Sequence, residues 1–498
     1  MPIHAAPAPR GAAARALLAV CLAALALPLS FSAGALAVPA IARTLGGSAS
    51  ALNWVTNAFM LAFGGLLLTA GALADRHGRR RLFLGGAGGF ALASLGVSLA
   101  PSVVLLDVLR AAQGAAAAAA LAGGSASLAQ LFEGHARTRA FSLLGTTFGI
   151  GLALGPLLAG NLIAWLGWRA VFASGVLLGT AAWWFALRAL PETHGPRHGR
   201  MDWAGSATFT AAIALLTMGL MQAGQAGWMA VPTLTSLVAS IAAFALFVKT
   251  EHRAEAPLLD LSLFRYGRFV GVQVLPLATC YGYVVLLVLM PLHLVGTQGM
   301  PEAHAALLML ALTAPMMVVP VIAGYLARHW ESGTLCAGGL LVAAAGLAWL
   351  AKVIDGPATS LVAPMLFIGI GTGLPWGLMD DLSVSVVPVE RAGMAAGIFG
   401  TTRVAGEGIA LALVTSLLSA FTARYLPGTP DEAMHVASMV SAGNLPAAAA
   451  IVPAATLQFA HGTALHQLLW LLAAITFAAA LLVAVMLRRP AALREATA

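Results

Sequence analysis

Ionisable side chains inside long apolar runs are the residues of this sequence that could do chemistry. Arg403 and Glu407 lie four residues apart, about one helical turn, and Asp380 and Asp381 end the preceding apolar run. A charged side chain inside an apolar segment is costly, so such a group is a candidate for function. A carboxyl group there can take up or release a proton as its surroundings change. Glu407 is therefore the first candidate for a proton carrier, and Asp380 and Asp381 are further candidates.

A second charged pair, Asp107 and Arg110, lies three residues apart in another apolar run. This spacing places both side chains on one face of a helix, where they can pair. The pair could line a cavity and respond to a proton or a substrate, which makes Asp107 another candidate, or it could be a static, neutralised pair. The acids near Arg403 have the same alternative, a structural salt bridge. Arg110 and Arg403 are the candidate charge partners of these acids.

No metal-binding, nucleotide-binding or catalytic pattern accompanies these charges. The cysteines Cys21, Cys280 and Cys336 lie far apart and form no zinc or disulfide pattern. The sequence also contains no HExxH motif, no Walker-type phosphate loop and no GxSxG motif. We therefore expect no metal, no cofactor and no enzyme activity.

A short, strongly basic turn at Gly71–Arg81 separates two apolar runs and reads G-A-L-A-D-R-H-G-R-R-R. Its glycines allow close backbone approach, and its acid can accept hydrogen bonds from arginines or from a helix N-terminus. Positive charge beside a membrane span marks the cytoplasmic side. The turn is therefore predicted to form a cytoplasmic gate. The gate residues would be Gly71, Asp75, Arg76, Gly78, Arg79 and Arg80.

The composition indicates a membrane protein with many spans. Of 498 residues, 60% are hydrophobic and only 9% are charged, against about 25% in soluble proteins. Apolar runs long enough to cross a bilayer recur fourteen times. They lie near 16–41, 54–74, 82–100, 103–131, 140–165, 168–188, 203–223, 230–248, 269–292, 305–327, 333–351, 359–382, 395–421 and 463–487. We expect an all-α polytopic membrane protein embedded in the lipid bilayer.

Positive charge gives the expected orientation. Most Lys and Arg residues fall in the loops and tails that an even number of spans places on one side. The opposite side holds only Arg43, Arg169, Lys352 and Arg424. Because cytoplasmic loops carry the positive excess, both termini are expected in the cytoplasm. The same rule explains the net charge of +8 without a nucleic-acid partner.

A sequence repeat indicates two related halves. The tripeptide Gly145-Thr146-Thr147 recurs as Gly400-Thr401-Thr402. In this alignment Arg403 falls opposite Phe148, so the charge exists in only one copy. Related halves around a central site are common in transporters. The expected units are a six-helix half at 1–188, an inserted helix pair with its linker at 189–250, and a second six-helix half at 251–498.

Several of these segments together resemble the major facilitator superfamily. The turn at Gly71–Arg81 resembles that family's loop between spans two and three. The family's L-x-R-x-x-Q-G-type signature in span four is matched by Leu109, Arg110, Gln113 and Gly114. The G-x-x-x-G-P-x-x-x-G signature of proton-coupled exporters in span five is matched by Gly151, Gly155, Pro156 and Gly160. With its fourteen spans, the chain resembles the fourteen-span drug:proton antiporter branch.

The resemblance implies a secondary transporter in a bacterial inner membrane, with two six-helix halves plus two inserted helices. It would export amphipathic, often cationic, organic compounds in exchange for protons and use no cofactor beyond the proton gradient. An exporter of one endogenous metabolite or natural product is the alternative. The expected partners are the small-molecule substrate, protons and lipid, and a monomer is expected, with or without accessory export proteins. A non-transporting sensor would instead predict a soluble signalling domain, which the composition does not indicate.

One position departs from this branch. Its members usually carry an acidic residue in the first span, and Ser30 stands in that place. The coupling residue and the coupling ion therefore stay open, and another buried carboxyl group would have to carry a proton. Aromatic side chains could stack on a flat cationic ligand, or they could simply pack. The candidates for the substrate cavity are Ser30, Phe59, Phe63, Gln113, Phe148, Trp376 and Phe399.

Overall fold

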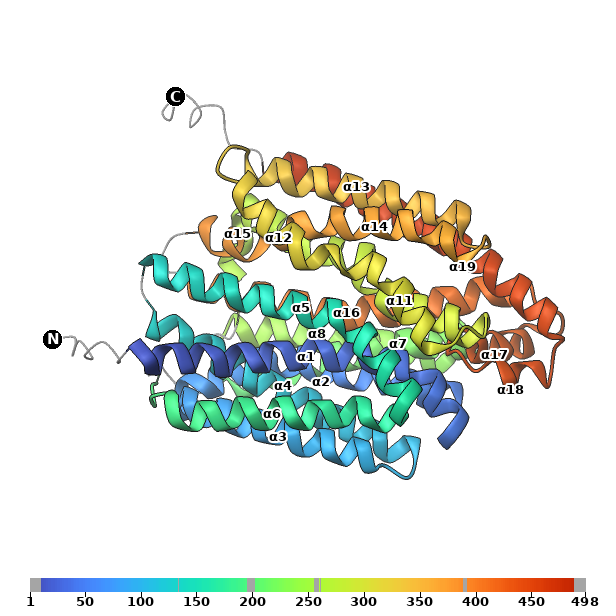
Figure 1. Ribbon diagram of the computed structural model, residues 1–498, viewed down its shortest axis with the longest axis horizontal. Coiled ribbons are helices and arrows are strands. Elements are labelled where there is room, and N and C mark those ends of the chain that lie inside the picture. Colours follow the sequence, from blue (N-terminus) through green and yellow to red (C-terminus); the bar gives the residue numbers. More distant parts are fainter. Residues whose placement is uncertain are drawn as a thin grey trace.

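The protein is an elongated bundle of helices (Figure 1). The computed structural model describes residues 10–132, 134–194, 202–254, 259, 261–387 and 392–487. These ranges contain helices and no strand. Fourteen segments are long and apolar enough to cross a membrane, which confirms the expected all-α polytopic fold. Both chain termini lie outside the described residues.

Long, uninterrupted helices make up the first part of the chain, as its apolar runs predict. They are α1 (Arg10–Leu45), α2 (Ala49–His77), α3 (Arg79–Leu99), α4 (Val103–Leu131), α5 (Gly134–Leu166), α6 (Trp168–Ala189), α7 (Trp203–Ala226) and α8 (Val231–Glu251). Polar caps set several of their starts. The side chains of Ser48, Ser102 and Asp202 accept hydrogen bonds from first-turn amides of α2, α4 and α7.

The second part of the chain is more broken. Its elements are η1 (Leu261–Arg265), α9 (Gly267–Thr279), η2 (Cys280–Val284), α10 (Leu286–Pro291), η3 (Leu292–Thr297), α11 (Glu302–Thr313), α12 (Pro315–Leu326), α13 (Ser332–Val353), α14 (Ala358–Trp376), α15 (Met379–Ser385), α16 (Ala392–Ala423), α17 (Pro430–Ser441), α18 (Leu445–Ala449) and α19 (Ala454–Met486). The span Gly267–Thr297 is one continuous helical segment that consists of four elements, α9, η2, α10 and η3. It is divided because η2 and η3 are π-helical turns, which are wider than the α-helical turns beside them. Pro315 separates α11 from α12, since proline cannot donate the backbone hydrogen bond of a continuous helix.

The last span begins earlier than its apolar run indicates. α19 starts at Ala454, directly after Pro453, whereas the sequence predicts a span at 463–487. The preceding segment contains α17 and α18, which form a small helical layer at one end of the bundle. α17 starts with a capping box in which Thr429 and Glu432 bond reciprocally.

Small residues let neighbouring helices approach closely. Where α2 meets α16, a Cβ atom added to Gly64 would lie 2.6 Å from the Cα of Ala405. Where α5 meets α1, a Cβ added to Gly151 would lie 2.6 Å from the carbonyl oxygen of Leu25. Close backbone contact of this kind is typical of membrane helices, because lipid provides little hydrophobic drive for their association.

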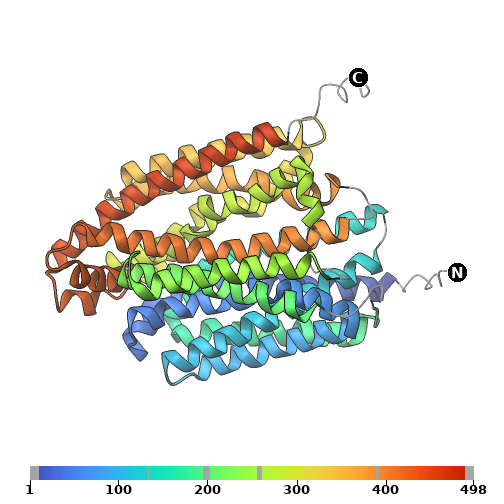
Figure 2. The ribbon, with the colours of Figure 1, turned by 180° about the vertical axis from the view of Figure 1, so that it is seen from behind.

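The helices α7 and α8 pack against each other, and α7 lies against α2 and α16. Figure 2 shows this green pair on the face turned to the viewer. Thr210 of α7 donates a hydrogen bond of 2.9 Å to the carbonyl oxygen of Gly65 on α2. A Cβ added to Gly224 would lie 2.9 Å from the Cα of Ser416 on α16. α7 therefore covers the seam between α2 and α16, and α8 packs on α7. The division at 1–188, 189–250 and 251–498 stays a prediction.

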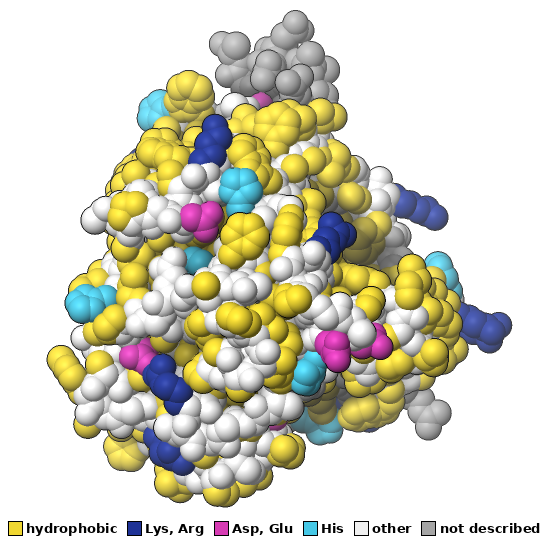
Figure 3. All heavy atoms as spheres, turned by 90° about the vertical axis from the view of Figure 1, so that its right-hand side faces the viewer, with side chains coloured by type: hydrophobic (Ala, Val, Ile, Leu, Met, Phe, Trp, Pro, Cys, Tyr) yellow, Lys and Arg dark blue, Asp and Glu magenta, His cyan; other side chains and the backbone are white. Residues whose placement is uncertain are grey.

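One end of the bundle joins early helices to late ones by direct contacts. Arg43, near the end of α1, forms an ion pair with Glu302 at the start of α11. A Cβ added to Gly443, which follows α17, would lie 3.6 Å from Cγ of Pro39 on α1. This end lies at the right of Figure 1, and Figure 3 shows it face on, with charged side chains scattered among apolar ones. The basic turn around Gly78 lies at the opposite end of the bundle.

Candidate functional site

Arg110 is wholly buried in α4 and is the centre of a first polar cluster. Its guanidinium donates hydrogen bonds to the carbonyl oxygen of Val55 at 2.8 Å and to the hydroxyl of Ser30 at 3.1 Å. It also donates to Oε1 of Gln113 at 2.6 Å, and Gln113 in turn donates to the hydroxyl of Ser94 at 2.7 Å. The cluster therefore links α1, α2, α3 and α4.

Two aromatic rings flank the Arg110 guanidinium. The ring centres of Phe59 and Phe172 lie 4.5 and 5.5 Å from the guanidinium carbon, which permits cation–π attraction. Among the described residues, the terminal nitrogen Nη2 has no hydrogen-bond partner. Gly34 of α1 lies beside this nitrogen, and an added Cβ would come within 3.2 Å of it. The cation is therefore held by aromatic faces and neutral acceptors in a tightly packed site.

Asp107 does not form an ion pair with Arg110. No ion pair among the described residues joins the two, and the Oδ1 atom of Asp107 is buried without a hydrogen-bond partner. The expectation of direct pairing from their spacing is therefore not met. The physical reason is that Arg110 extends toward α1 and α2, where Ser30 and Val55 accept its hydrogen bonds. Gln113 of α4 is its third acceptor, and the rings of Phe59 on α2 and Phe172 on α6 flank it.

A second polar cluster lies where α16 meets α15 and α5. Arg403 forms an ion pair with Asp380, with distances of 3.3 and 3.4 Å from Nη1 to the two carboxylate oxygens. The guanidinium carbon of Arg403 lies 5.2 Å from the ring centre of Phe148 on α5 and 5.7 Å from that of Phe399. A Cβ added to Gly145 of α5 would lie 3.6 Å from the Asp380 carboxylate. The cluster therefore bridges an early helix and two late ones.

Glu407 lies one turn further along α16 and is only 4% exposed. No ion pair among the described residues includes it, because Arg403 reaches Asp380 instead. Its sequence neighbour Gly406 faces η2, where the thiol of Cys280 lies 3.9 Å from the Gly406 carbonyl oxygen. At such a buried carboxyl group, proton binding and release depend on whether water and opposite charge can reach it.

The other candidate cavity residues are divided between the two clusters. Phe63 lies on α2 with its ring centre 5.7 Å from that of Phe59. Trp376 lies at the end of α14, with its ring centre 6.4 Å from that of Tyr283 and its indole nitrogen near Gly149 of α5. The aromatic candidates are all buried, whereas the candidate proton carrier Asp381 is exposed.

A small chamber lies between the clusters and the joined end of the bundle. Side chains of α1, α2, α10 and α16 enclose it, including Asn53, Asn57 and Thr415. Its volume is about 10 Å³, which is room for about one water molecule. This chamber is therefore too small to hold an organic substrate.

The glycine motif of α5 provides two close helix contacts. Gly151, Gly155 and Gly160 are buried, and Pro156 lies inside the helix. Gly151 packs against α1, as described above. A Cβ added to Gly160 would lie 2.8 Å from the carbonyl oxygen of Glu302 on α11. The motif thus places α5 against both an early helix and a late helix.

The basic turn is a single residue long. Gly78 alone separates α2 from α3, and its φ of 109° favours glycine. The guanidinium of Arg79 donates to Oδ1 of Asp75 at 3.0 and 2.8 Å. It also donates to the carbonyl oxygen of Ala126 at 3.1 Å and to Oε1 of Gln130 at 2.8 Å. Arg79 therefore ties the turn to the end of α4.

The other predicted gate residues differ in their surroundings. Arg80 donates a hydrogen bond of 2.9 Å to the carbonyl oxygen of Leu187 on α6. Arg76 is exposed. Gly71 has open space around it, with no atom within 4 Å of an added Cβ. The close backbone approach expected at Gly71 is therefore absent here, because no neighbouring helix covers that face.

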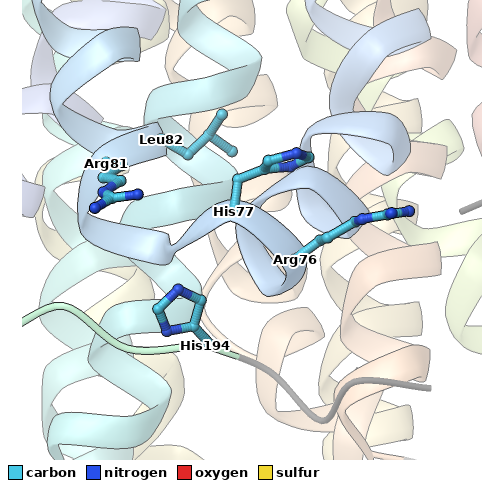
Figure 4. A pocket seen from close by; sticks show the side chains of 5 residues that line it. All are labelled: Arg76, His77, Arg81, Leu82 and His194. Carbon is cyan, nitrogen blue, oxygen red and sulfur yellow. The ribbon is translucent and has the colours of Figure 1, made fainter. Parts of the chain in front are cut away.

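A basic basin opens beside the turn (Figure 4). It has a volume of about 520 Å³ and is lined by Arg76, His77, Arg81, Leu82 and His194. In Figure 4, His194 lies on the chain segment after α6 and faces the turn between α2 and α3. The basin is a surface feature that two arginines and two histidines line, separate from the buried charges of the spans.

The sequence pattern did not reveal several polar partners of the turn. Glu192 and Thr193, which follow α6, bond to the first amides of α3, and Gln130 receives Arg79. At the same end, Glu251 accepts a hydrogen bond of 3.2 Å from the amide of Leu259. The one available signal was an acid, Glu192, placed directly after a span on the predominantly basic side.

Comparisons with known proteins agree with these observations. The family model of the Major Facilitator Superfamily matches residues 19–410. The cephamycin export protein CmcT of Amycolatopsis lactamdurans is 32% identical, over 84% of this chain and 87% of its own length. The probable actinorhodin transporter of Streptomyces coelicolor is 31% identical, over 76% and 68%. The tetracenomycin C resistance and export protein of Streptomyces glaucescens is 29% identical, over 91% and 85%.

Solved structures share the fold at low sequence identity. An inward-facing bacterial homologue of the human lysosomal transporter Spinster matches with a TM-score of 0.61 and 16% identity, over 96% of this chain and 98% of its own. A D-xylose-proton symporter matches with a TM-score of 0.58 and 17% identity, over 86% and 96%.

The fold, the buried charges and these matches define a multi-pass membrane transporter. The chain belongs to the Major Facilitator Superfamily. Its fourteen spans and its drug- and antibiotic-exporting relatives confirm the resemblance to the fourteen-span drug-efflux branch.

Proposed function

We propose that the protein is a secondary active exporter that exchanges amphipathic, often cationic, organic compounds for protons across a bacterial inner membrane. The observation that carries this proposal is Glu407, a carboxyl group 4% exposed in a membrane span and outside the ion pairs of the described residues. Relatives whose names state antibiotic export support the direction of transport, and another is named for multidrug resistance. The termini are assigned to the cytoplasm, on the side of the basic turn.

In the proposed cycle, a proton and a cationic substrate compete for Glu407. The carboxyl group holds a proton when water is excluded and releases it when the cavity opens to water or when opposite charge approaches. Arg403 would change partners during this cycle, between Asp380 in the present arrangement and Glu407 in another. Export then needs no covalent step and no cofactor beyond the proton gradient.

The contacts between early and late helices support a state closed at the outer end. Arg43 of α1 pairs with Glu302 of α11, and Gly443, which follows α17, packs beside Pro39 of α1 at that end. Asp75 and Asp380, toward the basic end, are 47% and 45% exposed. We infer that transport opens the outer contacts and closes the basic end, with the two halves rocking about the central spans.

A dye-efflux experiment tests the proposed function. Cells that express the protein should export ethidium, a flat organic cation, and a protonophore should stop the export. Glu407→Gln should abolish export driven by a proton gradient while the protein still inserts, whereas Asp431→Asn, at an exposed acid on α17, should export normally. Normal proton-driven export by Glu407→Gln would show that Glu407 is structural, and Asp107, Asp380 or Asp381 would become the next candidate.

Cysteine labelling tests the proposed orientation. A membrane-impermeant reagent added to intact cells should label single cysteines placed between Leu426 and Val452. It should not label a cysteine in place of Arg79 until the membrane is opened. Labelling at position 79 in intact cells would reverse the assignment of sides.

Export of one natural product is the second candidate function. The observation that favours it is the naming of three relatives for transport of, export of or resistance to single compounds: actinorhodin, cephamycin and tetracenomycin C. A susceptibility panel separates the two functions: resistance to many unrelated cations supports multidrug export, whereas resistance to one compound class supports a dedicated exporter.

A further inference from the structure

We propose that Glu192, on the segment that follows α6, is a positioning residue of the cytoplasmic gate. It caps the start of α3 from outside the helix and so fixes the turn that carries Asp75 and Arg79. The transport part of this inference rests on the proposed export function, and its structural part does not.

The start of α3 lacks a cap of its own. The residue at the cap position is Gly78, which has no side chain to accept the free amides of the first turn. The segment after α6 supplies the acceptors instead. The carbonyl oxygen of Thr193 accepts from the amide of Arg79 at 2.9 Å, and Oε1 of Glu192 accepts from the amide of Arg80 at 3.1 Å. Two otherwise unpaired amides are therefore satisfied by a segment more than a hundred residues away in sequence.

Both the geometry and the negative charge of Glu192 suit a position at the N-terminus of α3. A carboxylate at a helix N-terminus is attracted by the helix dipole. Its second oxygen, Oε2, also lies 3.6 Å from Nε of Arg81, whose side chain is 78% exposed. The Arg81 contact is weak because water screens it. The backbone contact to Arg80 is therefore the main interaction of Glu192.

The contact between Glu192 and the start of α3 also requires glycine at position 78. Its φ of 109° already disfavours other residues. In addition, a Cβ at this position would collide with the Glu192 carboxylate. Glycine in the gate motif thus has a specific partner, and that partner lies outside the motif.

The cap acts on the gate through Arg79. Thr193 holds the backbone amide of this residue, while its guanidinium reaches Asp75 and Gln130. If the Glu192 side chain is lost, the amide of Arg80 loses its acceptor, and the segment that carries Thr193 loses an anchor to α3. The backbone of Arg79 is then held less firmly, and so is the guanidinium that reaches Asp75 and Gln130. The segment after α6 leads to α7, so the gate turn and the inserted helix pair are joined through the same short stretch of chain.

Hydrogen–deuterium exchange on the purified full-length protein tests the cap directly. Glu192→Ala should raise exchange at residues 79–82 at least tenfold and leave the middle of α3 unchanged. Glu192→Gln keeps an acceptor oxygen and should restore most of the protection. His194→Ala, two residues along the same segment, is the matched control and should exchange like the wild type. Unchanged exchange in Glu192→Ala would overturn the proposal, whatever the protein transports.

The transport readout uses ethidium efflux in inverted membrane vesicles. Glu192→Ala should lower the maximal rate about tenfold with an unchanged KM, because the gate moves incorrectly while the substrate site is intact, and Glu192→Gln should recover most of the rate. A rise in KM without a fall in maximal rate would contradict a gate role. If wild-type vesicles export no ethidium, the proposed function fails, and the exchange result still decides whether Glu192 caps α3.

Discussion

The guanidinium carbon of Arg403 lies 5.2 Å from the ring centre of Phe148, and the two residues occupy equivalent places in the internal sequence repeat. One copy of the repeat thus presents a cation and the other presents an aromatic face. The ion pair with Asp380 holds Arg403 in this position. If the two predicted units rock about the axis that relates them, as proposed above, a contact between equivalent positions lies near that axis and is expected to change during transport.

Phe148→Leu should therefore weaken the contact between early and late helices on the basic side. The cation–π contact contributes about 0.5–2 kcal/mol, which corresponds to roughly a two- to thirty-fold change in the balance of states. We expect slower ethidium efflux in Phe148→Leu and nearly normal efflux in Phe148→Tyr, which keeps the ring. Equal efflux by the leucine variant and the wild type, at equal protein level, would show that the contact is passive.

Asp380→Asn should destabilise the protein, because it leaves the 12%-exposed side chain of Arg403 without its opposite charge. Asp380 itself is 45% exposed, so water screens the pair and the expected loss is about 1 kcal/mol. A thermal melt in detergent measures this loss. Asp381→Asn, at the adjacent exposed acid, is the control and should melt like the wild type. A lower melting temperature for Asp381→Asn than for Asp380→Asn would refute the pairing of Arg403 with Asp380.

The membrane spans could be predicted from sequence, because length and hydropathy are local properties of the chain. The partners of the buried charges could not. The spacing of Asp107 and Arg110 gave the correct helix face, but Arg110 found Ser30 on another helix, eighty residues away in sequence. Arg403 likewise reached Asp380 and not Glu407, its neighbour on the same face. Helix periodicity fixes which residues share a face, whereas tertiary packing decides which neighbour that face meets.

The turn predicted to form the gate shows the same limit in another form. Its glycine and charge pattern predicted a tight turn, and the bond between Asp75 and Arg79 lies within that pattern. Glu192 lies in a segment without periodicity or a repeated motif, so its contact with Arg80 became visible only when α6 was packed beside α3.

The cap of α17 should depend on pH. The carboxylate of Glu432 accepts hydrogen bonds of 2.9 Å from the backbone amide and from the hydroxyl of Thr429, and these bonds hold its pKa below the usual value. A carboxyl group whose pKa is lowered by folding stabilises the fold at pH values above its pKa in the unfolded chain. This contribution disappears as the pH falls through the lowered pKa of the folded protein. The wild type should therefore have a higher melting temperature than Glu432→Gln at neutral pH, and the two melting temperatures should be equal in acid.

Asp431→Asn is the matched control for this comparison, since it changes the neighbouring acid and leaves the capping box with Thr429 intact. Its difference from the wild type should be small at both pH values. A difference between wild type and Glu432→Gln that grows in acid would contradict the predicted sign.

Ser30→Asp should give the first span a carboxylate beside Arg110. The hydroxyl of Ser30 already lies 3.1 Å from Nη1, so an aspartate fits the same contact. Ser30→Ala removes one hydrogen bond and should cost about 1 kcal/mol. If Glu407 is the proton carrier, the double variant Ser30→Asp, Glu407→Gln should regain part of the proton-driven efflux that Glu407→Gln loses. Efflux no better than that of Glu407→Gln would show that a carboxyl group beside Arg110 cannot take over coupling.

Asp75→Asn tests the gate from its acidic side. Oδ1 of Asp75 receives two nitrogens of Arg79, at 3.0 and 2.8 Å, and asparagine keeps an acceptor oxygen but loses the charge. Because Asp75 is 47% exposed, the effect on stability should be about 1 kcal/mol or less, and membrane insertion should be normal. Efflux should nevertheless fall several-fold, because Arg79 is then held less tightly to α2 and connects α2 with α4 less firmly. His77→Gln, at the exposed neighbour in the turn, is the control, and wild-type efflux by Asp75→Asn at equal protein level would remove the ion pair from the gating mechanism.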